Sequence, residues 1–207
     1  MDVGEPKFRR RKADRPAEIV SAAMAVFAEK GFAAARLDEI AKRAGVSKGA
    51  LYLYFETKEE IFRAAVQQAI APNILGLRAM IAAHPGPIGD LLKIIPDRVA
   101  SLVETFPVGG VVKMVIGEAR NFPEIARLWH DELVAHVFGA LTEAIAAAQA
   151  RGEVRSGDPR IFVIQFIAPL LLTVIWNETF EPVGAPHFDL RTVARQHLDT
   201  MLRGLAP

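Results

Sequence analysis

Apolar side chains recur along most of the chain at three- and four-residue spacing, the period of helices that bury one face. No stretch shows the strict alternation of a half-buried strand. The pattern therefore predicts an all-α protein with about nine helices, separated by short segments rich in Gly, Pro and capping residues. The predicted helices cover residues 15–30, 37–44, 48–54, 58–84, 90–106, 111–120, 123–150, 160–178 and 189–204.

The second and third predicted helices are joined by a tight turn, which is the layout of a helix-turn-helix motif. Gly45 permits the left-handed backbone of such a turn, and the small Ala41 lets the two helices approach closely. Val46 and Leu51 are expected to face inward and hold the third helix at a fixed angle. The outer edge of that helix is then predicted to enter the major groove of DNA, although an ordinary helical hairpin would share this pattern.

The residues predicted to contact DNA lie on or beside this third helix. Lys48 can donate to guanine O6 and N7, and Gly49 lets the DNA backbone approach closely. Tyr52 and Tyr54 can donate their hydroxyls to phosphates, which set the register of the complex. Lys58 and the amides that open the fourth helix form a second anion site. The full predicted set is Arg36, Ser47, Lys48, Gly49, Ala50, Tyr52, Leu53, Tyr54 and Lys58.

The region 19–62 carries a longer pattern that includes these positions. Its residues are Ile19, Ala22-Ala23, Phe27, Gly31-Phe32, Leu37, Ile40-Ala41, Ala44-Gly45-Val46-Ser47, Gly49, Leu51-Tyr52, Tyr54-Phe55, Lys58-Glu59 and Ile61-Phe62. This pattern resembles the DNA-binding domain of the TetR/AcrR (tetracycline-repressor) family. The resemblance implies a homodimer on a roughly palindromic double-stranded DNA operator. One departure is Ala35-Arg36, where the family usually has Thr or Ser before the second helix, so Arg36 is expected to reach a phosphate instead.

The expected organisation has three parts: a basic flexible arm at 1–14, the helix-turn-helix domain at 15–60, and a helical ligand-binding and dimerisation domain at 61–207. A basic arm can release counterions from a phosphate backbone or lie in a minor groove, and a solvated tail would have the same composition. The basic residues of the arm are Lys7, Arg9, Arg10, Arg11 and Lys12.

Beyond residue 62 the resemblance is one of overall plan. It implies that the helices at 160–178 and 189–204 pair with those of a second copy as a four-helix bundle; the alternative is that their apolar stripes cover the chain's own core. It also implies a small-molecule effector held among the C-terminal helices, of apolar or aromatic character. Candidate lining residues, each of which can equally be ordinary core, are Met80, Phe106, Met114, Trp129, Phe138, Phe166 and Trp176. Polar candidates near them are Glu118, Arg120, Gln165 and Asn177.

Several classes of protein are disfavoured. The absence of cysteine excludes disulfide scaffolds and thiol catalysis. His130 and His136 do not share a helix face, so neither a metal site nor another cofactor is expected. No nucleophile elbow or phosphate-binding glycine loop is present, which argues against an enzyme. The longest apolar run, 161–176, is shorter than the ~20 residues that span a bilayer, so a cytoplasmic protein without a membrane partner is expected.

Together these features predict a transcriptional repressor that a small apolar or aromatic molecule releases from its operator. The expected mechanism is a tilt of the fourth helix, which links the effector pocket to the DNA-binding domain. Two alternatives stay open. One is a DNA-binding regulator that is controlled by a protein partner without a small-molecule effector, and the other is an activator.

Overall fold

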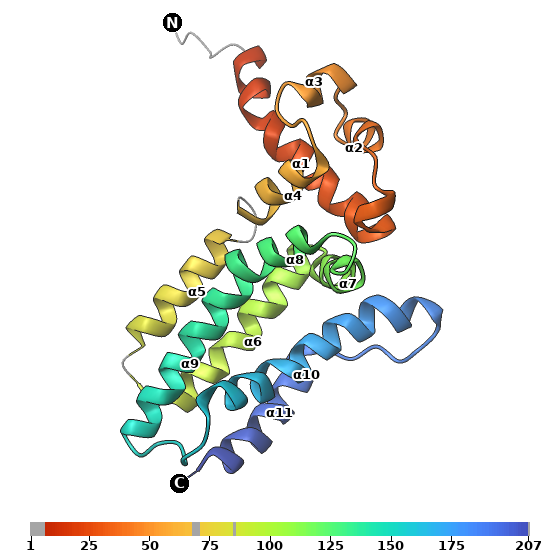
Figure 1. Ribbon diagram of the computed structural model, residues 1–207. Coiled ribbons are helices and arrows are strands. Elements are labelled where there is room, and N and C mark those ends of the chain that lie inside the picture. The colour runs from red at the N-terminus through yellow and green to blue at the C-terminus, as the bar shows by residue number, and fades with distance from the viewer. Residues whose placement is uncertain (1–6, 68–70, 85, 207) are drawn as a thin grey trace, which may run out of the picture.

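The computed structural model describes residues 7–67, 71–84 and 86–206, without the side chains of 7–14 and 71–73. Within these ranges every regular element is a helix, as the hydrophobic pattern predicts. Figure 1 shows a small N-terminal domain, formed by α1–α4, stacked on one end of a larger helical domain. The elements are α1 (Lys7–Ala34), α2 (Leu37–Arg43), α3 (Lys48–Tyr52), α4 (Lys58–Ala65), α5 (Ala71–Ala83), α6 (Ile88–Thr105), α7 (Val108–Glu118), α8 (Pro123–Trp129), the π-helical turn η2 (His130–Val134), α9 (Ala135–Ala150), α10 (Pro159–Phe180), the 3-10 turn η3 (Glu181–Val183) and α11 (Leu190–Leu205).

The N-terminal domain is built around three phenylalanine rings that are fully buried. Phe27 lies 5.3 Å from Phe32 and 6.0 Å from Phe62, measured between ring centroids. Phe27 comes from α1 and Phe62 from α4, and Phe32 follows the kink at Gly31. The aromatic cluster therefore joins the first and fourth helices, and α2 and α3 pack beside it through Ile40 and Leu51.

Side chains at the N-cap position begin four of the described helices. Each side chain accepts a hydrogen bond from a backbone N–H of the first helical turn, which satisfies a group that has no partner inside the helix. The caps and their distances are Ser47 to Ala50 N at 3.1 Å, Thr57 to Glu60 N at 3.1 Å, Asp158 to Arg160 N at 2.9 Å and Asp189 to Thr192 N at 2.8 Å.

Several helix boundaries differ from the prediction, and those of α1 and α3 belong to the DNA-binding domain. Helix α1 begins at Lys7 and not at residue 15, so the part of the predicted arm from 7 to 14 is helical. Residues 1–6 and the basic side chains of the arm lie outside the described part. The predicted break at Gly31 is confirmed, because its φ of 79° is outside the helical region. The recognition helix α3 ends at Tyr52, before the predicted residue 54.

The predicted fourth helix, at 58–84, is two helices. Helix α4 ends at Ala65 and α5 begins at Ala71, while residues 68–70 lie outside the described part. The apolar pattern continues across both helices because each faces a buried core, but Pro72, at which the sequence predicts a kink, lies in the first turn of α5. The division between 15–60 and 61–207 stays a prediction, since α4 packs against α1 and also reaches α8.

The C-terminal domain has a core of its own between α6, α9, α10 and α11. Leu92, Leu141, Phe166 and Leu198 are buried there, one from each helix. The predicted helix over 123–150 is observed as α8, η2 and α9, with a π-helical turn in the middle.

Within the part of the chain that the structure describes, two helical stretches are long and apolar enough to span a membrane, by length and composition alone. They are Pro123–Ala150, with mean hydropathy 1.4, and Pro159–Val183, with mean hydropathy 1.8. The second contains the run 161–176, so the expectation that this apolar segment is too short does not hold for the helix as a whole. Both helices contribute buried residues to the cores just described.

Candidate nucleic-acid interface

The turn between α2 and α3 has the predicted geometry. Gly45 has a φ of 67°, a left-handed conformation that glycine adopts without strain. The Val46 N–H then donates to the Ala41 carbonyl at 3.0 Å, which closes the turn. Ala41 and Leu51 are buried between the helices, so α3 is held at a fixed angle to α2.

The opposite edge of α3 faces solvent. Ser47, Lys48 and Gly49 are exposed, and Tyr52 and Leu53 have 44% and 80% of their surface accessible. Two predicted contacts, Ala50 and Tyr54, are half-buried. A polar edge with an apolar tip, Leu53, is therefore presented at the far end of the N-terminal domain from the C-terminal helices (Figure 1).

The amine of Lys48 has two partners on this surface. It lies 2.7 Å from Asp38 Oδ1 on α2 and 5.9 Å from the centre of the Tyr52 ring. The hydrogen bond to Asp38 is the largest reason why the pKa of Lys48 is raised, and the nearby negative charge adds to it. The first residue of the recognition helix is therefore paired with a carboxylate of α2.

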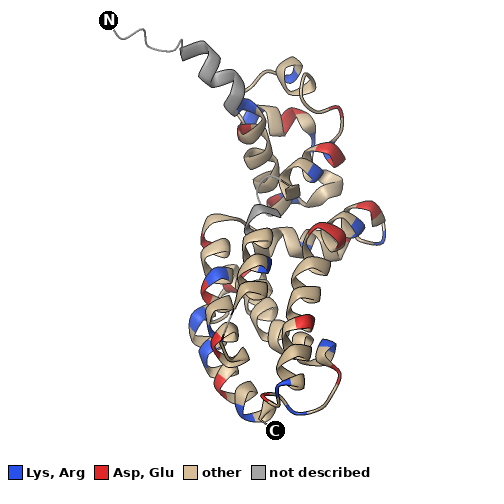
Figure 2. Cartoon of the chain, turned by 90° about the vertical axis from the view of Figure 1, so that its left-hand side faces the viewer, with Lys and Arg blue, Asp and Glu red and all other residues tan. Residues whose placement is uncertain are grey.

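Arg36 lies at the start of α2 and makes no side-chain capping bond there. It is exposed, and the N-terminal turn of α2 carries Asp38 and Glu39. Acidic and basic side chains therefore alternate on the described part of the N-terminal domain, as Figure 2 shows. Two further ion pairs there join Lys30 to Glu39 at 2.5 Å and Arg43 to Glu29 at 2.6 Å.

The structure places Lys58 inside the domain. Its amine donates to the Phe32 carbonyl at 2.7 Å and to the Ala33 carbonyl at 3.1 Å. It also lies 4.6 Å from the centre of the Phe32 ring and 5.4 Å from that of Phe122, at the start of α8. Lys58 thus ties the end of α1 to α4 and to the start of α8, and its contact with DNA stays a prediction.

The sequence analysis missed a close junction between α1 and α7. A Cβ atom at Gly110 would lie 2.6 Å from the Cβ of Ala28, so only glycine fits there. At the other end of α7, Glu118 Oε1 accepts a hydrogen bond from Ala33 N at 3.0 Å. The sequence predicts that residues 107–110 separate two helices, whereas Gly109 and Gly110 lie inside α7 and permit close helix contact.

The same turn of α7 contacts the long helix α10. A Cβ atom at Gly109 would lie 2.9 Å from Glu178 Cβ and 3.1 Å from the Val174 carbonyl oxygen. Helix α7 therefore lies between the DNA-binding domain on one side and α10 on the other.

The structure does not bring the predicted effector-lining residues together. Met114 and Trp129 are buried in the core shared with the N-terminal domain, and Phe106 packs against that core. Phe166 is buried in the second core, where Met80 and Phe138 pack at the edge.

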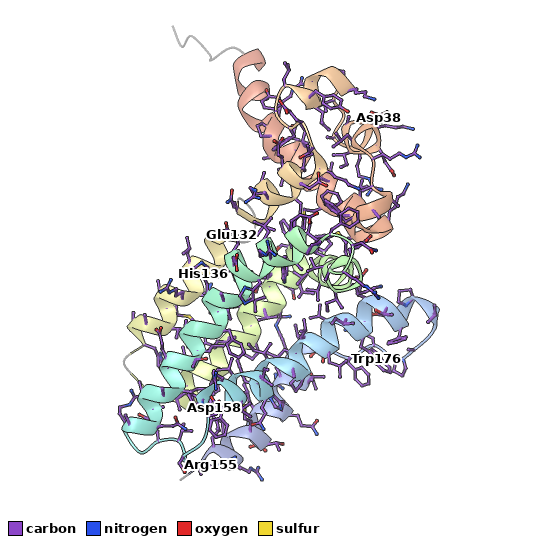
Figure 3. All side chains as sticks on the ribbon, viewed as in Figure 1. Asp38, Glu132, His136, Arg155, Asp158 and Trp176 are labelled. Atoms are coloured by element: carbon purple, nitrogen blue, oxygen red, sulfur yellow. The ribbon has the colours of Figure 1, made fainter. Side chains whose placement is uncertain are left out.

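Trp176 lies apart from the other candidate effector residues. It stacks beside Phe180 and Phe188 near the end of α10, and its indole N–H donates to the Pro186 carbonyl at 3.0 Å (Figure 3). Of the polar candidates, Glu118 is engaged with α1, and Asn177 pairs with the backbone of Phe188.

A hollow of about 360 Å³ opens between α5, the start of α6 and the end of α9. None of the seven predicted effector residues lines it. Its lining consists of Arg78, Ile81, Ala82, His84, Gly86, Ile88, Leu91, Ala140, Glu143, Ala144, Ala147 and Arg151.

The outward face of α10 is apolar. Ile161, Ile164, Leu171 and Leu172 recur there at helical spacing, with between 38% and 62% of their surface accessible. The opposite side of α10 supplies Phe166 and Leu170 to the core. Helix α10 is thus apolar on two faces, of which one is covered by this chain.

Two family models match the chain. The model described as bacterial regulatory proteins of the tetR family matches residues 19–65, and that of the tetracyclin repressor-like C-terminal domain matches 88–190. The first match falls on α1–α4 and the second on α6–α10 and the loop that follows, so both domains are similar to the same family.

Curated relatives include a transcriptional repressor and a transcriptional activator. The HTH-type transcriptional repressor BepR of Brucella suis is 29% identical over 197 residues, which are 90% of each chain. The HTH-type transcriptional activator FasR of Mycolicibacterium smegmatis is 42% identical over 65 residues, which are 31% of this chain and 30% of the relative. The whole-length match is thus to a repressor, and a shorter one is to an activator.

Solved structures share the fold along nearly the whole chain. SmeT, the repressor of the Stenotrophomonas maltophilia multidrug efflux pump SmeDEF, has a TM-score of 0.69 at 23% identity and covers 93% of this chain and 90% of its own. A TetR family transcriptional regulator from Pseudomonas syringae has a TM-score of 0.66 at 25% identity, over 92% and 96% of the two chains.

Proposed function

Because this chain belongs to the TetR family of bacterial transcription regulators, we propose that it is a sequence-specific repressor that a small apolar or aromatic molecule releases from its operator. Members of this family bind operator DNA and act as dimers. For this chain we propose which surface binds DNA, which surface forms the dimer, that the protein represses transcription, and that a small molecule controls it.

The observation that carries the proposal is the exposed edge of α3. A helix that is fixed by Ala41 and Leu51 and exposes Lys48, Gly49 and Tyr52 can enter a major groove without rearrangement. The N-cap Ser47 is exposed as well, so its hydroxyl and the first amides of α3 can approach a phosphate.

The proposed dimer contact is the outward face of α10, together with α11. A stripe of Ile161, Ile164, Leu171 and Leu172 gains stability when it leaves water, at about 25 cal/mol per Å² of apolar surface. A second copy can cover this stripe with its own α10 in a two-fold arrangement, which is the commonest closed symmetry. The alternative occupant by composition, a lipid bilayer, would have to accept Gln165 on the same face.

We also propose that a small molecule controls DNA binding. Similar structures include a regulator called flavonoid-responsive and the repressor of a multidrug efflux pump, which favours an apolar or aromatic effector. The scatter of Met114, Phe166 and Trp176 over separate cores favours instead a regulator controlled by a protein partner. Activation of transcription is the alternative, because a curated protein that is similar to the DNA-binding region of this chain is an activator.

The route from effector to DNA is proposed to pass through two contacts. Lys58 on α4 and Gly110 on α7 both touch the end of α1, so a shift of either helix would move the DNA-binding domain. A coupling of about 1–3 kcal/mol corresponds to a 5- to 150-fold change in DNA affinity.

An electrophoretic mobility-shift assay on the DNA upstream of the chain's own reading frame tests the proposal. We expect a shifted band at low salt that unlabelled upstream DNA competes away and random DNA does not. Aromatic and apolar compounds from a small-molecule library are then added to the complex, and release of the DNA is expected for one class. No shift with any intergenic fragment at low salt would contradict DNA regulation.

A further inference from the structure

The ion pair between Asp38 and Lys48 connects the two helices of the helix-turn-helix motif on its outer surface. Asp38 lies in the first turn of α2 (Figure 3), and its Oδ1 is 2.7 Å from the amine of Lys48 at the start of α3. The side chains of Asp38 and Lys48 are 64% and 59% exposed. Such an exposed pair adds little to folding stability. Its main effect is on the position of the Lys48 amine.

Lys48 is the cation at the start of the recognition helix, and it has two fixed neighbours. The amine lies 2.7 Å from Asp38 Oδ1 and 5.9 Å from the centre of the Tyr52 ring. In the free protein, the carboxylate also cancels the charge that a phosphate would otherwise attract.

Binding to DNA of any sequence depends mainly on the number of phosphates that Lys and Arg neutralise. A phosphate bound to Lys48 beside Asp38 would lie close to the Asp38 carboxylate, which repels it, so phosphate binding favours release of Lys48 from Asp38. A lysine that stays beside Asp38 can still donate a second N–H to a guanine O6 or N7, because an ammonium group has three donors.

We propose that Asp38 is a specificity-determining residue: it keeps Lys48 away from phosphates and directs it toward base edges. The inference rests on the proposed binding of DNA through α3. Asp38 thus contributes to the recognition of the DNA sequence. The ion pairs Lys30–Glu39 and Arg43–Glu29 contain no residue of the recognition helix α3.

The test compares wild type with Asp38→Asn by fluorescence anisotropy on two duplexes, the upstream DNA and a random sequence, over a series of salt concentrations. For the variant we expect random-sequence affinity to rise about two- to five-fold. The slope of log K against log salt should steepen by about 0.9, the contribution of one more neutralised phosphate. The ratio of upstream to random affinity should fall.

Three variants serve as controls. Asp90→Asn removes a similar exposed pair, Asp90 with Lys93 at 2.9 Å, on α6, and should leave both affinities unchanged. Asp38→Glu keeps the carboxylate and should retain most of the specificity. In a Lys48→Gln background, Asp38→Asn should no longer steepen the salt dependence, because the cation that it releases is gone.

An unchanged salt slope and an unchanged affinity ratio in Asp38→Asn would overturn the inference while DNA binding persists. Loss of the helical circular dichroism signal in that variant would overturn it too, since the carboxylate would then support the fold. Failure of the wild type to bind either duplex would instead contradict the proposed function. The two failures are therefore distinguishable.

Discussion

At the scale of single residues, the capping groups and the turn glycines were predictable because their chemistry is local. Ser47, Thr57 and Gly31 act within three or four residues of their own position. Lys58 was not predictable in the same way, because its carbonyl partners on Phe32 and Ala33 lie far back in the sequence. The spacing of residues predicts partners that are near in the sequence but not partners that are far away in it.

At Gly49, folding and DNA binding are expected to favour different side chains. It is helical, and a Cβ atom added to it would meet nothing within 4 Å. We therefore expect Gly49→Ala to stabilise the free protein by about 0.5–1 kcal/mol, since glycine is a poor helix former. The added methyl group should nevertheless weaken binding to upstream DNA, because the DNA backbone is expected to approach there.

Chemical denaturation and anisotropy on the same protein check this pair of effects. An alanine variant that binds upstream DNA as well as the wild type does would show that no close DNA contact occurs at position 49.

The candidate effector residues show that residue type alone does not identify a side chain that binds a ligand. Met114, Trp129 and Phe166 were chosen because they are large and apolar, and all three are buried in well-packed cores. Composition cannot distinguish a core side chain from one that lines a cavity, since the same hydrophobic effect places both.

At the scale of helices, the positions of most elements followed from the hydrophobic period, whereas their contacts did not. The helix predicted at 58–84 is two helices, α4 and α5, and the glycine pair Gly109-Gly110, predicted to lie between two helices, is in the first turn of α7 and forms close contacts. Both errors have one cause: the period of apolar residues shows which face is buried but not what covers it.

The close approach of α7 to α1 predicts a sharp difference between two glycines on one helix. Gly110→Ala would place a Cβ atom 2.6 Å from that of Ala28, and we expect a loss of about 1–3 kcal/mol of stability. Gly117→Ala on the same helix meets nothing within 4 Å and should be neutral or stabilising. Urea denaturation of both variants measures the difference, and equal stability of the two would show that α7 can move away from α1 freely.

Glu153 links the loop after α9 to the start of α6 and makes stability depend on pH. Its Oε1 accepts from Arg151 Nε at 2.6 Å and its Oε2 from Ile88 N at 2.9 Å. The hydrogen bond from Arg151 and then that from Ile88 lower the pKa of this carboxyl below 4.5. Its stabilising effect is therefore present above about pH 4.5 and is lost as the pH falls through the lower folded-state value.

We expect Glu153→Gln to lower the thermal midpoint at pH 7 and to lose less stability than the wild type between pH 5 and 3. Melting curves across this pH range measure both effects. Glu143→Gln, at an exposed carboxylate on α9, is the control and should follow the wild type. Parallel curves for Glu153→Gln and the wild type would contradict the assigned role.

At the scale of the whole molecule, the resemblance over residues 19–62 predicted a family that both family models support. The dimer contact is proposed on physical grounds, from the apolar stripe of α10. Leu172, 62% exposed, is the most accessible of the large apolar residues on that stripe. We expect Leu172→Glu to give monomers, because two buried carboxylates would face each other across the two-fold axis.

Light scattering after size exclusion measures the mass of each variant. Leu75→Glu, at a residue of α5 that is 57% exposed, is the matched control and should remain dimeric. A dimer that survives Leu172→Glu would place the contact elsewhere on the molecule.

The account depends on a dimer that presents two α3 helices to one face of DNA. Nuclease footprinting of the wild-type protein on its upstream DNA tests this most directly. We predict protection of an inverted repeat with half-sites about 34–36 Å apart, one turn of the double helix. Protection of a single half-site, or of none at low salt, would contradict it.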